Sequence, residues 1–370
     1  MNKLFLLLLV TALTFYGDAP PCNQSPEASG PPVSCESLER GMGLPSGQKC
    51  YPPAYNAPAN ISVKDGWDFN LFASFLYWHV SQEGMNTAVE LPVLDVSTGT
   101  LTSPSFLYKP GFKVGFGFDT NYDNWTGSLE YTWMHQKTYH TSHTSSTSPF
   151  SDAGWYIFGV AAPVTNATFV SAKWKMHLDM LDLAFSRPFY EGTRITIAPI
   201  AGMRGLWIRQ DFKIGMDNPL FLLNPDHLST FTMRSHSWAV GPMLGVGGHW
   251  MLGSNLRFEG KTGASILYTR YSKIEQKQSI IASNTTTLST ASDRGDLNVL
   301  RPMADLGVGM GWGSYSSCQK YYFDVSFRYD FNVLWNQNAM AEFINGMNSF
   351  PGANGNLYMH GLTASARLDF

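Results

Sequence analysis

Residues 362–370 read Leu362-Thr-Ala-Ser-Ala-Arg-Leu-Asp-Phe370, and this stretch decides the fold class of the chain. Apolar and polar residues alternate strictly along it. A period of two is that of a β-strand with one apolar and one polar face. A chain that stops on such a strand, with an aromatic residue last, is typical of a bacterial outer-membrane barrel, where one face meets lipid and the other a polar lumen. The predicted apolar face consists of Leu362, Ala364, Ala366, Leu368 and Phe370.

The first residues predict export. Residues 1–19 contain a positive residue at Lys3, an apolar run over residues 4–15, and small residues at Gly17 and Ala19. This pattern predicts a secretory signal peptide with an approximate cleavage site. The run is too short for a transmembrane helix, which needs about 20 apolar residues. Residues 20–65, rich in Pro, Gly and Ser, are expected to form an irregular periplasmic segment.

The composition agrees with a barrel that is apolar outside and polar inside. Charged residues make up 14% of the chain, against roughly 25% in typical soluble domains. Aromatic residues also make up 14%, and there are 34 glycines. A mean hydropathy of −0.13 excludes a helical membrane protein. The net charge of −3 offers no basic patch for nucleic acid.

Alternating segments recur through residues 66–370, which we interpret as one barrel domain. The predicted fold is all-β: a transmembrane antiparallel up-and-down β-barrel of about ten strands, with 12–16 left open because long loops could hide more. The segments are 67–77, 112–118, 125–133, 174–187, 195–203, 238–250, 256–268, 300–312, 321–333 and 357–370.

The connections between segments alternate in length. Outer-membrane barrels have short periplasmic turns and long extracellular loops, so this alternation favours the same fold. The short connections are 119–124, 188–192, 252–254 and 313–320. The long ones, rich in Ser, Thr and Asn, are 82–107, 138–172, 211–235, 271–298 and 335–356.

Two features disturb the pattern. The apolar phase of segment 174–187 reverses near Met180-Leu181, which predicts a β-bulge. Pro199 and Pro242 fall in mid-segment, where each removes a ladder hydrogen bond, so we expect bulges or different strand limits there.

The charged residues of the polar face are the candidate functional residues. They allow two interpretations: paired ladders that fill and stiffen the barrel, or the lining of a water-filled pore. Barrels of about eight strands are filled by side chains and open channels are typical of about 16–18, so ten strands would be narrow. The pore-lining candidates are Lys113, Glu130, Arg194, Arg204, Arg257, Glu259, Lys261, Arg301, Asp305, Asp324, Arg328 and Asp330, with Lys175, Asp179 and Arg367 assigned to the same face.

Short motifs resemble a known family. They are the Arg187-Pro-Phe189 turn, the following Pro199-x-x-Gly-x-Arg204 strand, the stretch 237–247 and the terminal Phe370. Over roughly residues 65–370 the chain resembles the Legionella-type and Chlamydia-like major outer membrane proteins. The resemblance implies a pore-forming outer-membrane barrel, often abundant and sometimes held in disulfide-linked networks, with no catalytic residues to transfer.

These observations lead to one expected function and one alternative. We expect a porin-like protein of the bacterial outer membrane that allows passive diffusion of small hydrophilic solutes. The alternative is a structural or adhesive surface barrel with a side-chain-filled lumen and long displayed loops. Expected partners are outer-membrane lipid and lipopolysaccharide, and the barrel-assembly machinery, which would read Phe370 as an assembly signal.

No enzyme activity, cofactor or metal site is expected. The sequence has no nucleophile motif such as GxSxG. Three histidines, His135, His140 and His143, lie near one another without helical metal-ligand spacing, and we interpret them as part of a solvated extracellular loop.

The four cysteines are disulfide candidates: Cys22, Cys35, Cys50 and Cys318. The predicted topology places all of them on the periplasmic side, which is oxidising. One disulfide could tie the N-terminal segment to the barrel rim, and others could join neighbouring molecules in self-association. Cys318 could equally be a free thiol, because four cysteines allow three full pairings that a sequence does not distinguish.

Overall fold

A computed structural model describes residues 69–90, 99–120, 124–144, 149–152, 155, 167–191, 194–217, 228–253, 255–282, 285–294, 296–316, 320–340 and 355–370. The predicted signal peptide, the segment 20–65 and all four cysteines lie outside these residues. Among the described residues, no helix has the length and apolar character needed to cross a membrane.

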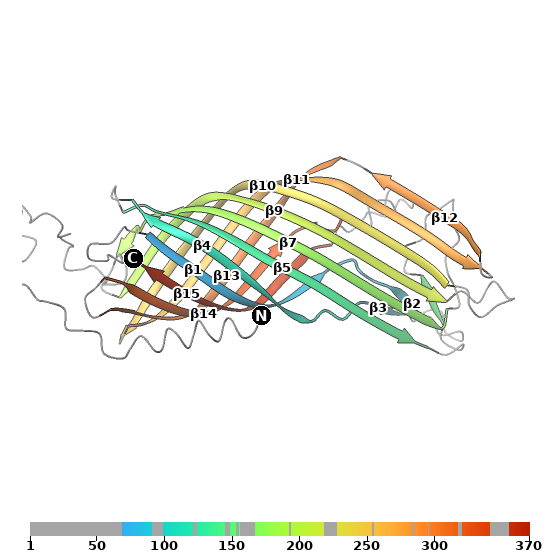
Figure 1. The fold of residues 1–370 in the computed structure, drawn as a ribbon, viewed down its shortest axis with the longest axis horizontal. Helices are drawn as coiled ribbons and strands as arrows, with labels where there is room; N and C mark the ends of the chain where they lie inside the picture. Colours follow the sequence, from blue (N-terminus) through green and yellow to red (C-terminus); the bar gives the residue numbers. More distant parts are fainter. Residues whose placement is uncertain are drawn as a thin grey trace, which may run out of the picture.

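Ten antiparallel strands close into a barrel (Figure 1). Each pairs with its neighbours along the chain, β10 pairs with β9, and β1 pairs with β15 to complete the circle. The predicted number of strands is confirmed, and each of the ten alternating segments lies in one of them. The barrel strands are β1 (Phe69–Gln82), β4 (Tyr108–Asp119), β5 (Thr126–His143), β7 (Phe169–Ser186), β9 (Ile195–Asp217), β10 (Leu228–Gly253), β11 (Leu256–Ala282), β13 (Leu297–Tyr315), β14 (Tyr322–Leu334) and β15 (Leu357–Asp369).

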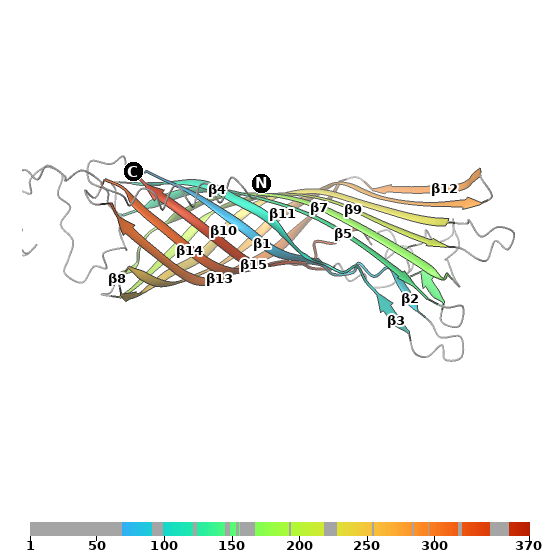
Figure 2. The ribbon, with the colours of Figure 1, turned by 60° about the horizontal axis from the view of Figure 1, so that its bottom comes forward.

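Five short strands lie outside the circle. β8 (Tyr190–Glu191) pairs with β9 at the end where β15 finishes (Figure 2). At the opposite end, β12 (Thr285–Arg294) pairs antiparallel with the last residues of β11, and β2 (Ala88–Glu90) pairs with both β3 (Thr100–Thr102) and β6 (Phe150–Asp152). Figure 2 shows these elements projecting beyond the barrel at that end.

The outer face carries an apolar band of exposed side chains. On β9 these include Ile195, Ile197, Met203 and Trp207, which are 41–48% exposed. A continuous exposed apolar surface of this kind marks contact with lipid or another partner. In a closed barrel it is the lipid-facing band, bounded by aromatic residues at the membrane interfaces.

Several strands are much longer than a membrane requires. β9, β10 and β11 contain 23, 26 and 27 residues, whereas about 9–11 residues span the bilayer. They continue past the apolar band at the end opposite the short turns. The expected long loops 211–235 and 271–298 are therefore largely strand, because their backbones keep pairing outside the lipid.

The expected bulge in β7 is absent. β7 pairs without a register shift with β5 on one side and with β9 on the other. What changes is the chemistry of its inner face, which is apolar at Leu178 and Met180 and becomes charged at Asp182. The apolar pattern therefore reverses while the pleat continues.

Each of the two prolines lies where its strand is not paired with one of its two neighbouring strands. Pro199 lies at the turn end of β9, where the pairing of β9 with β7 has already stopped at Ile200. Pro242 and Gly241 have no registered partner in β11, although β10 pairs with β11 on either side of them. The predicted irregularity is present as a local interruption on one side of β10.

Candidate functional site

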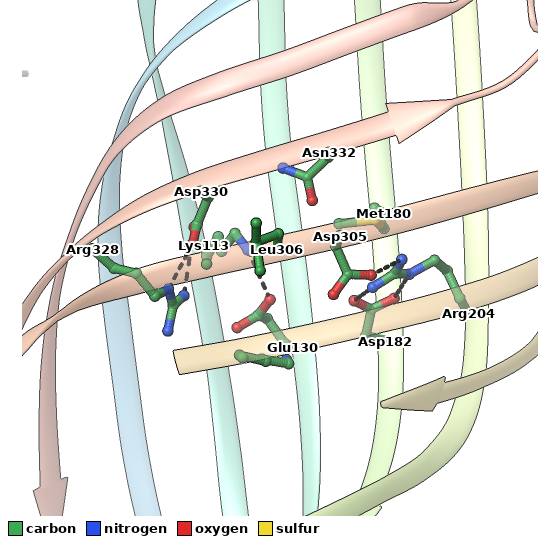
Figure 3. A pocket seen from close by; sticks show the side chains of 12 residues that line it. Lys113, Glu130, Met180, Asp182, Arg204, Asp305, Leu306, Arg328, Asp330 and Asn332 are labelled. Carbon is green, nitrogen blue, oxygen red and sulfur yellow. Dashed lines mark hydrogen bonds and ion pairs between the residues drawn. The ribbon is translucent and has the colours of Figure 1, made fainter. Parts of the chain in front are cut away.

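The lumen contains a network of ion pairs near the end with the short turns. At its centre Arg204 binds Asp182 in a bidentate manner, with Nε–Oδ1 at 2.8 Å and Nη2–Oδ2 at 2.9 Å (Figure 3). Its Nη1 also donates to Asp305 Oδ1 at 2.9 Å. Arg204 is buried, so this single cation holds two carboxylates in a low-polarity setting.

A second group of charges lies closer to the short turns. Arg257 donates to Glu259 Oε2 at 3.1 Å and, through Nη2, to Asp324 Oδ1 at 2.8 Å. Arg328 donates to Asp330 Oδ1 at 2.6 Å and lies 3.8 Å from Glu259. These contacts join β11 to β14 across the lumen side of the wall.

Two further pairs complete the network. Lys113 on β4 donates to Glu130 on β5 at 3.2 Å. Arg367 donates to Asp369 on the same strand, at 2.5 Å from Nη2. The inner face of β15 is polar from Thr363 to Asp369, as its alternating sequence predicted, and Arg367 lies on the predicted face.

The structure brings most of the predicted pore-lining residues to one surface, with exceptions. Lys261 lines the same lumen, and Arg301 is buried with its guanidinium 5.9 Å from the Tyr271 ring. Arg194 is exposed in the turn before β9 and takes no part in the network.

The prediction that Lys175 and Asp179 face the lumen is wrong. Both are odd-numbered residues of β7, on the outer face that also carries Leu181 and Leu183. The error follows from the apparent phase reversal, because a bulge would have turned them inward.

Space inside the network is small. A cavity of about 30 Å³ is lined by the charges in Figure 3, including Lys113, Glu130, Asp182, Arg204 and Asp305. That volume holds about one or two water molecules. Among the described residues, no group of three His, Cys, Asp or Glu residues is placed to hold a metal ion.

Above the network the lumen is closed by what we call the apolar layer. It consists of inward side chains of the barrel wall that pack together and are at most 2% exposed. Its members are Leu76, Trp78, Met134, Met176, Leu178, Leu206, Ile208, Leu267, Met303, Leu334 and Met359.

Hydrogen bonds join the apolar layer to the ion pairs below it. Trp78 Nε1 donates to Thr363 Oγ1 at 3.1 Å, and Thr363 Oγ1 donates to Asp330 Oδ2 at 2.6 Å. Lys113 Nζ lies 5.3 Å from the Trp78 ring centroid. These hydrogen bonds join the two zones through buried polar groups that satisfy one another. The hydroxyl group of Thr132, which also lies between the zones, has no hydrogen-bond partner among the described residues.

Connections fold inward over the apolar layer. Gln210 on β9 donates to Gln82 at 3.0 Å and to Gln337 at 2.9 Å. Gln337 also accepts a 2.7 Å hydrogen bond from Tyr271 through its carbonyl oxygen. Met340, from the connection after β14, joins the same buried apolar cluster.

Sequence reasoning missed three parts of this site. Asp182 and Asp369 are lumen carboxylates that the sequence-based list of pore-lining residues does not contain. The apolar layer was missed because its residues alternate with polar ones like any lipid-facing strand. For the part of the layer on residues 174–178 a signal was available, because the outward neighbours Lys175 and His177 are polar.

A closed ten-stranded barrel with a lipid-facing band, short turns at one end and long extensions at the other defines an outer-membrane β-barrel protein. The chain belongs to the family described as Legionella pneumophila major outer membrane protein precursor, whose model matches residues 61–370. The protein is located in the bacterial outer membrane.

Other comparisons are distant. No curated protein matches the chain. Among solved structures it is similar to the outer membrane protease OmpT from Escherichia coli, with 11% identity, a TM-score of 0.40, and coverage of 82% of this chain and 96% of that one. It is also similar to a major outer membrane protein from Thermus thermophilus, with 13% identity, a TM-score of 0.28, and coverage of 82% of this chain and 98% of that one. A third similar structure is the Pseudomonas putida toluene transporter TodX, with 8% identity, a TM-score of 0.30, and coverage of 83% of this chain and 90% of that one.

Proposed function

We propose that this protein is a closed surface barrel, which anchors and displays extracellular strand extensions rather than conducting solutes. The observation that carries the proposal is the apolar layer across the lumen. Hydrophilic solutes would have to pass side chains such as Trp78, Met176 and Met303, which are packed together and at most 1% exposed. Desolvating a polar solute in such a layer costs several kcal/mol, roughly 2–7 per unpaired group.

The large share of the barrel strands that lies outside the lipid-facing band supports the display of extracellular extensions as the function. β9, β10 and β11 continue well past the lipid-facing band, and β12 pairs alongside the outer part of β11 (Figure 2). A membrane anchor alone would not need this extra sheet. The paired charges and the packed layer make a rigid base from which the extensions project.

Passive diffusion through a narrow pore is the second candidate. It is favoured by the ion-paired zone with its small cavity at the short-turn end of the lumen, which is polar enough to admit ions. Conduction would then require the apolar layer to move. The absence of enzyme activity stays a prediction, supported by the involvement of the lumen carboxylates in ion pairs.

Single-channel recording in planar bilayers tests these alternatives. We expect folded, heat-modifiable wild-type protein to give no reproducible conductance steps. A Trp78→Ala, Met134→Ala and Met303→Ala triple variant, which thins the apolar layer, should give steps. The matched control, Leu71→Ala, Leu183→Ala and Leu244→Ala, removes side chains from the outer face and should stay silent. Reproducible steps from the wild type would overturn the closed barrel and support the pore.

A further inference from the structure

The outer face of five neighbouring strands carries three rows of basic residues. Barrel register places one residue from each of β5, β7, β9, β10 and β11 side by side in every row. The lowest row is His135, His177, Arg209, His236 and Lys273. The middle row is Lys137, Lys175, Asp211, Arg234 and Glu275, and the upper row is Tyr139, Lys173, Lys213, Thr232 and Lys277. We call these three rows the basic belt.

The belt is strongly positive although the whole chain has a net charge of −3. Its three rows contain eight Lys and Arg residues against two carboxylates, Asp211 and Glu275. Glu275 lies beyond the apolar band, outside the membrane-spanning part of β11. A hydrogen bond from Lys277 is the main cause that holds the pKa of Glu275 at about 2. Glu275 is therefore negatively charged at neutral pH, and the belt is positive even with this negative charge counted.

Part of the belt lacks any anionic partner within the described residues. The ion pairs of this surface involve Arg234, Lys273 and Lys277. In contrast, Lys137 lies directly opposite Lys175. Lys173 lies directly opposite Lys213. Like charges facing each other across a sheet are destabilising unless an anion lies between them.

The height of the belt on the barrel indicates the occupant. The row directly below contains Trp133, Asp179, Trp207, Trp238 and Arg270 on the same five strands, so three of its five residues are tryptophans. Rows of aromatic residues mark the level of lipid headgroups in outer-membrane barrels. The belt begins one row above, on the side of the long strand extensions.

We propose that the basic belt binds the phosphate groups of a glycolipid headgroup in the outer leaflet. Lys and Arg are the side chains that recognise phosphate, by charge and by directed hydrogen bonds. One acyl-anchored headgroup against β5, β7 and β9 would lay its chains on the apolar band and bring its phosphates between the opposed lysines. The proposal concerns the outer surface and does not depend on whether the lumen conducts.

Lipid binding to the folded, full-length protein in neutral detergent tests the proposal. Native mass spectrometry would count bound bisphosphorylated lipid A and, separately, its dephosphorylated derivative. We expect the phosphorylated form to bind at least about tenfold more tightly, since each basic residue near an anionic lipid surface strengthens binding several-fold. Equal binding of the two forms would overturn the proposal without requiring any variant.

Variants then locate the site. Lys137→Gln, Lys175→Gln and Lys213→Gln together should abolish most of the preference for the phosphorylated lipid. The matched control, Arg187→Gln, Arg194→Gln and Lys320→Gln, removes three cations at the short-turn end and should leave the preference intact. A preserved preference in the belt variant would contradict the assignment of the site.

Competition identifies the source of the phosphate. Inorganic phosphate at millimolar concentration should fail to displace the lipid, because the apolar band holds the acyl chains of a lipid ligand only. Displacement by inorganic phosphate at concentrations comparable to those of the lipid would show that the belt is a site for free phosphate and would overturn the lipid proposal.

Discussion

At the scale of single residues, Arg204 illustrates how the lumen is stabilised. Its guanidinium is the shared partner of Asp182 and Asp305, at 2.8–2.9 Å. Bringing three charges out of water is costly, and only complete pairing offsets that cost. Removing Arg204 alone should therefore destabilise the protein much more than replacing Arg204 and both carboxylates together by apolar residues.

An Arg204→Ala variant should therefore lose about 3–5 kcal/mol of unfolding free energy, because the buried Asp182 and the largely buried Asp305 lose their shared cation. Urea unfolding of the refolded protein in lipid vesicles measures the loss. Replacing Arg204, Asp182 and Asp305 together by Met and Leu should restore most of the stability. The control Arg270→Ala breaks an exposed pair with Asp296 and should change little. A mild effect of Arg204→Ala would refute the pairing.

Phe370 stabilises the closure of the barrel, where the last strand pairs with the first. Its backbone N–H donates to Phe69 O at 3.0 Å, and the two ring centroids lie 5.8 Å apart. These contacts join β15 to β1 where the barrel closes. The residue also ends the alternating strand that the assembly machinery is expected to read.

Deleting Phe370 should lower the amount of heat-modifiable, folded protein in the outer membrane, because closure loses its last backbone and ring contacts. Quantitative gels of membrane fractions measure this yield. Phe189→Ala is the control, since that ring is 87% exposed in a turn at the same end. An unchanged yield after the deletion would remove the claim that Phe370 is an assembly signal.

At the scale of elements, β7 is the strand whose two faces exchange character along its length. Its inner face is apolar from Val170 to Met180 and its outer face is apolar from Leu181 to Phe185. Above the lipid, water wets the outside while packed side chains fill the inside. Below that level, lipid covers the outside and ion pairs occupy the lumen.

The register of β7 predicts a labelling pattern in intact cells. Cysteine at position 175, as Lys175→Cys, should react with a membrane-impermeant maleimide above the background of the parent protein. Leu183→Cys, on the same face but within the lipid-facing band, should not react. If Lys175→Cys were unreactive and the protein folded normally, the strand would have to contain the bulge that its sequence suggested.

At the scale of the whole molecule, topology controls where the cysteines can meet. The connection between β13 and β14 lies at the end of the barrel that also holds the turns after β4 and β10. The first barrel strand also begins at this end, next to Phe370. We propose that Cys318 shares the periplasmic side with Cys22, Cys35 and Cys50.

An impermeant thiol reagent applied to intact cells should therefore leave Cys318 unlabelled, because the outer membrane separates the two. Peptide mapping of non-reduced native membranes should identify disulfides among the four cysteines, within one molecule or between neighbours. Labelling of Cys318 from outside would contradict both the disulfide proposal and the orientation of the barrel.

The sequence by itself determined the fold class, the ten strand-forming segments and the positions of the short turns. Period-two alternation is a local property, and a membrane imposes it on each spanning strand separately, so it can be read strand by strand. For the same reason the pairs Arg257–Asp324 and Arg328–Asp330 lay on the predicted inner face. The alternation between short and long connections supplied the orientation.

Only the tertiary structure decided what fills the lumen and where the lipid-facing band stops. An alternating strand has the same pattern whether its apolar face meets lipid or a packed interior, so Met176 and Leu183 look equivalent in sequence although they face opposite ways. Closure of the ten strands brings inward-facing residues such as Met176 together into the apolar layer. It leaves their outward-facing neighbour Lys175 in the basic belt. The distinction depends on the height of a residue along the barrel and on its cross-strand neighbours, which are set by pairing between distant segments.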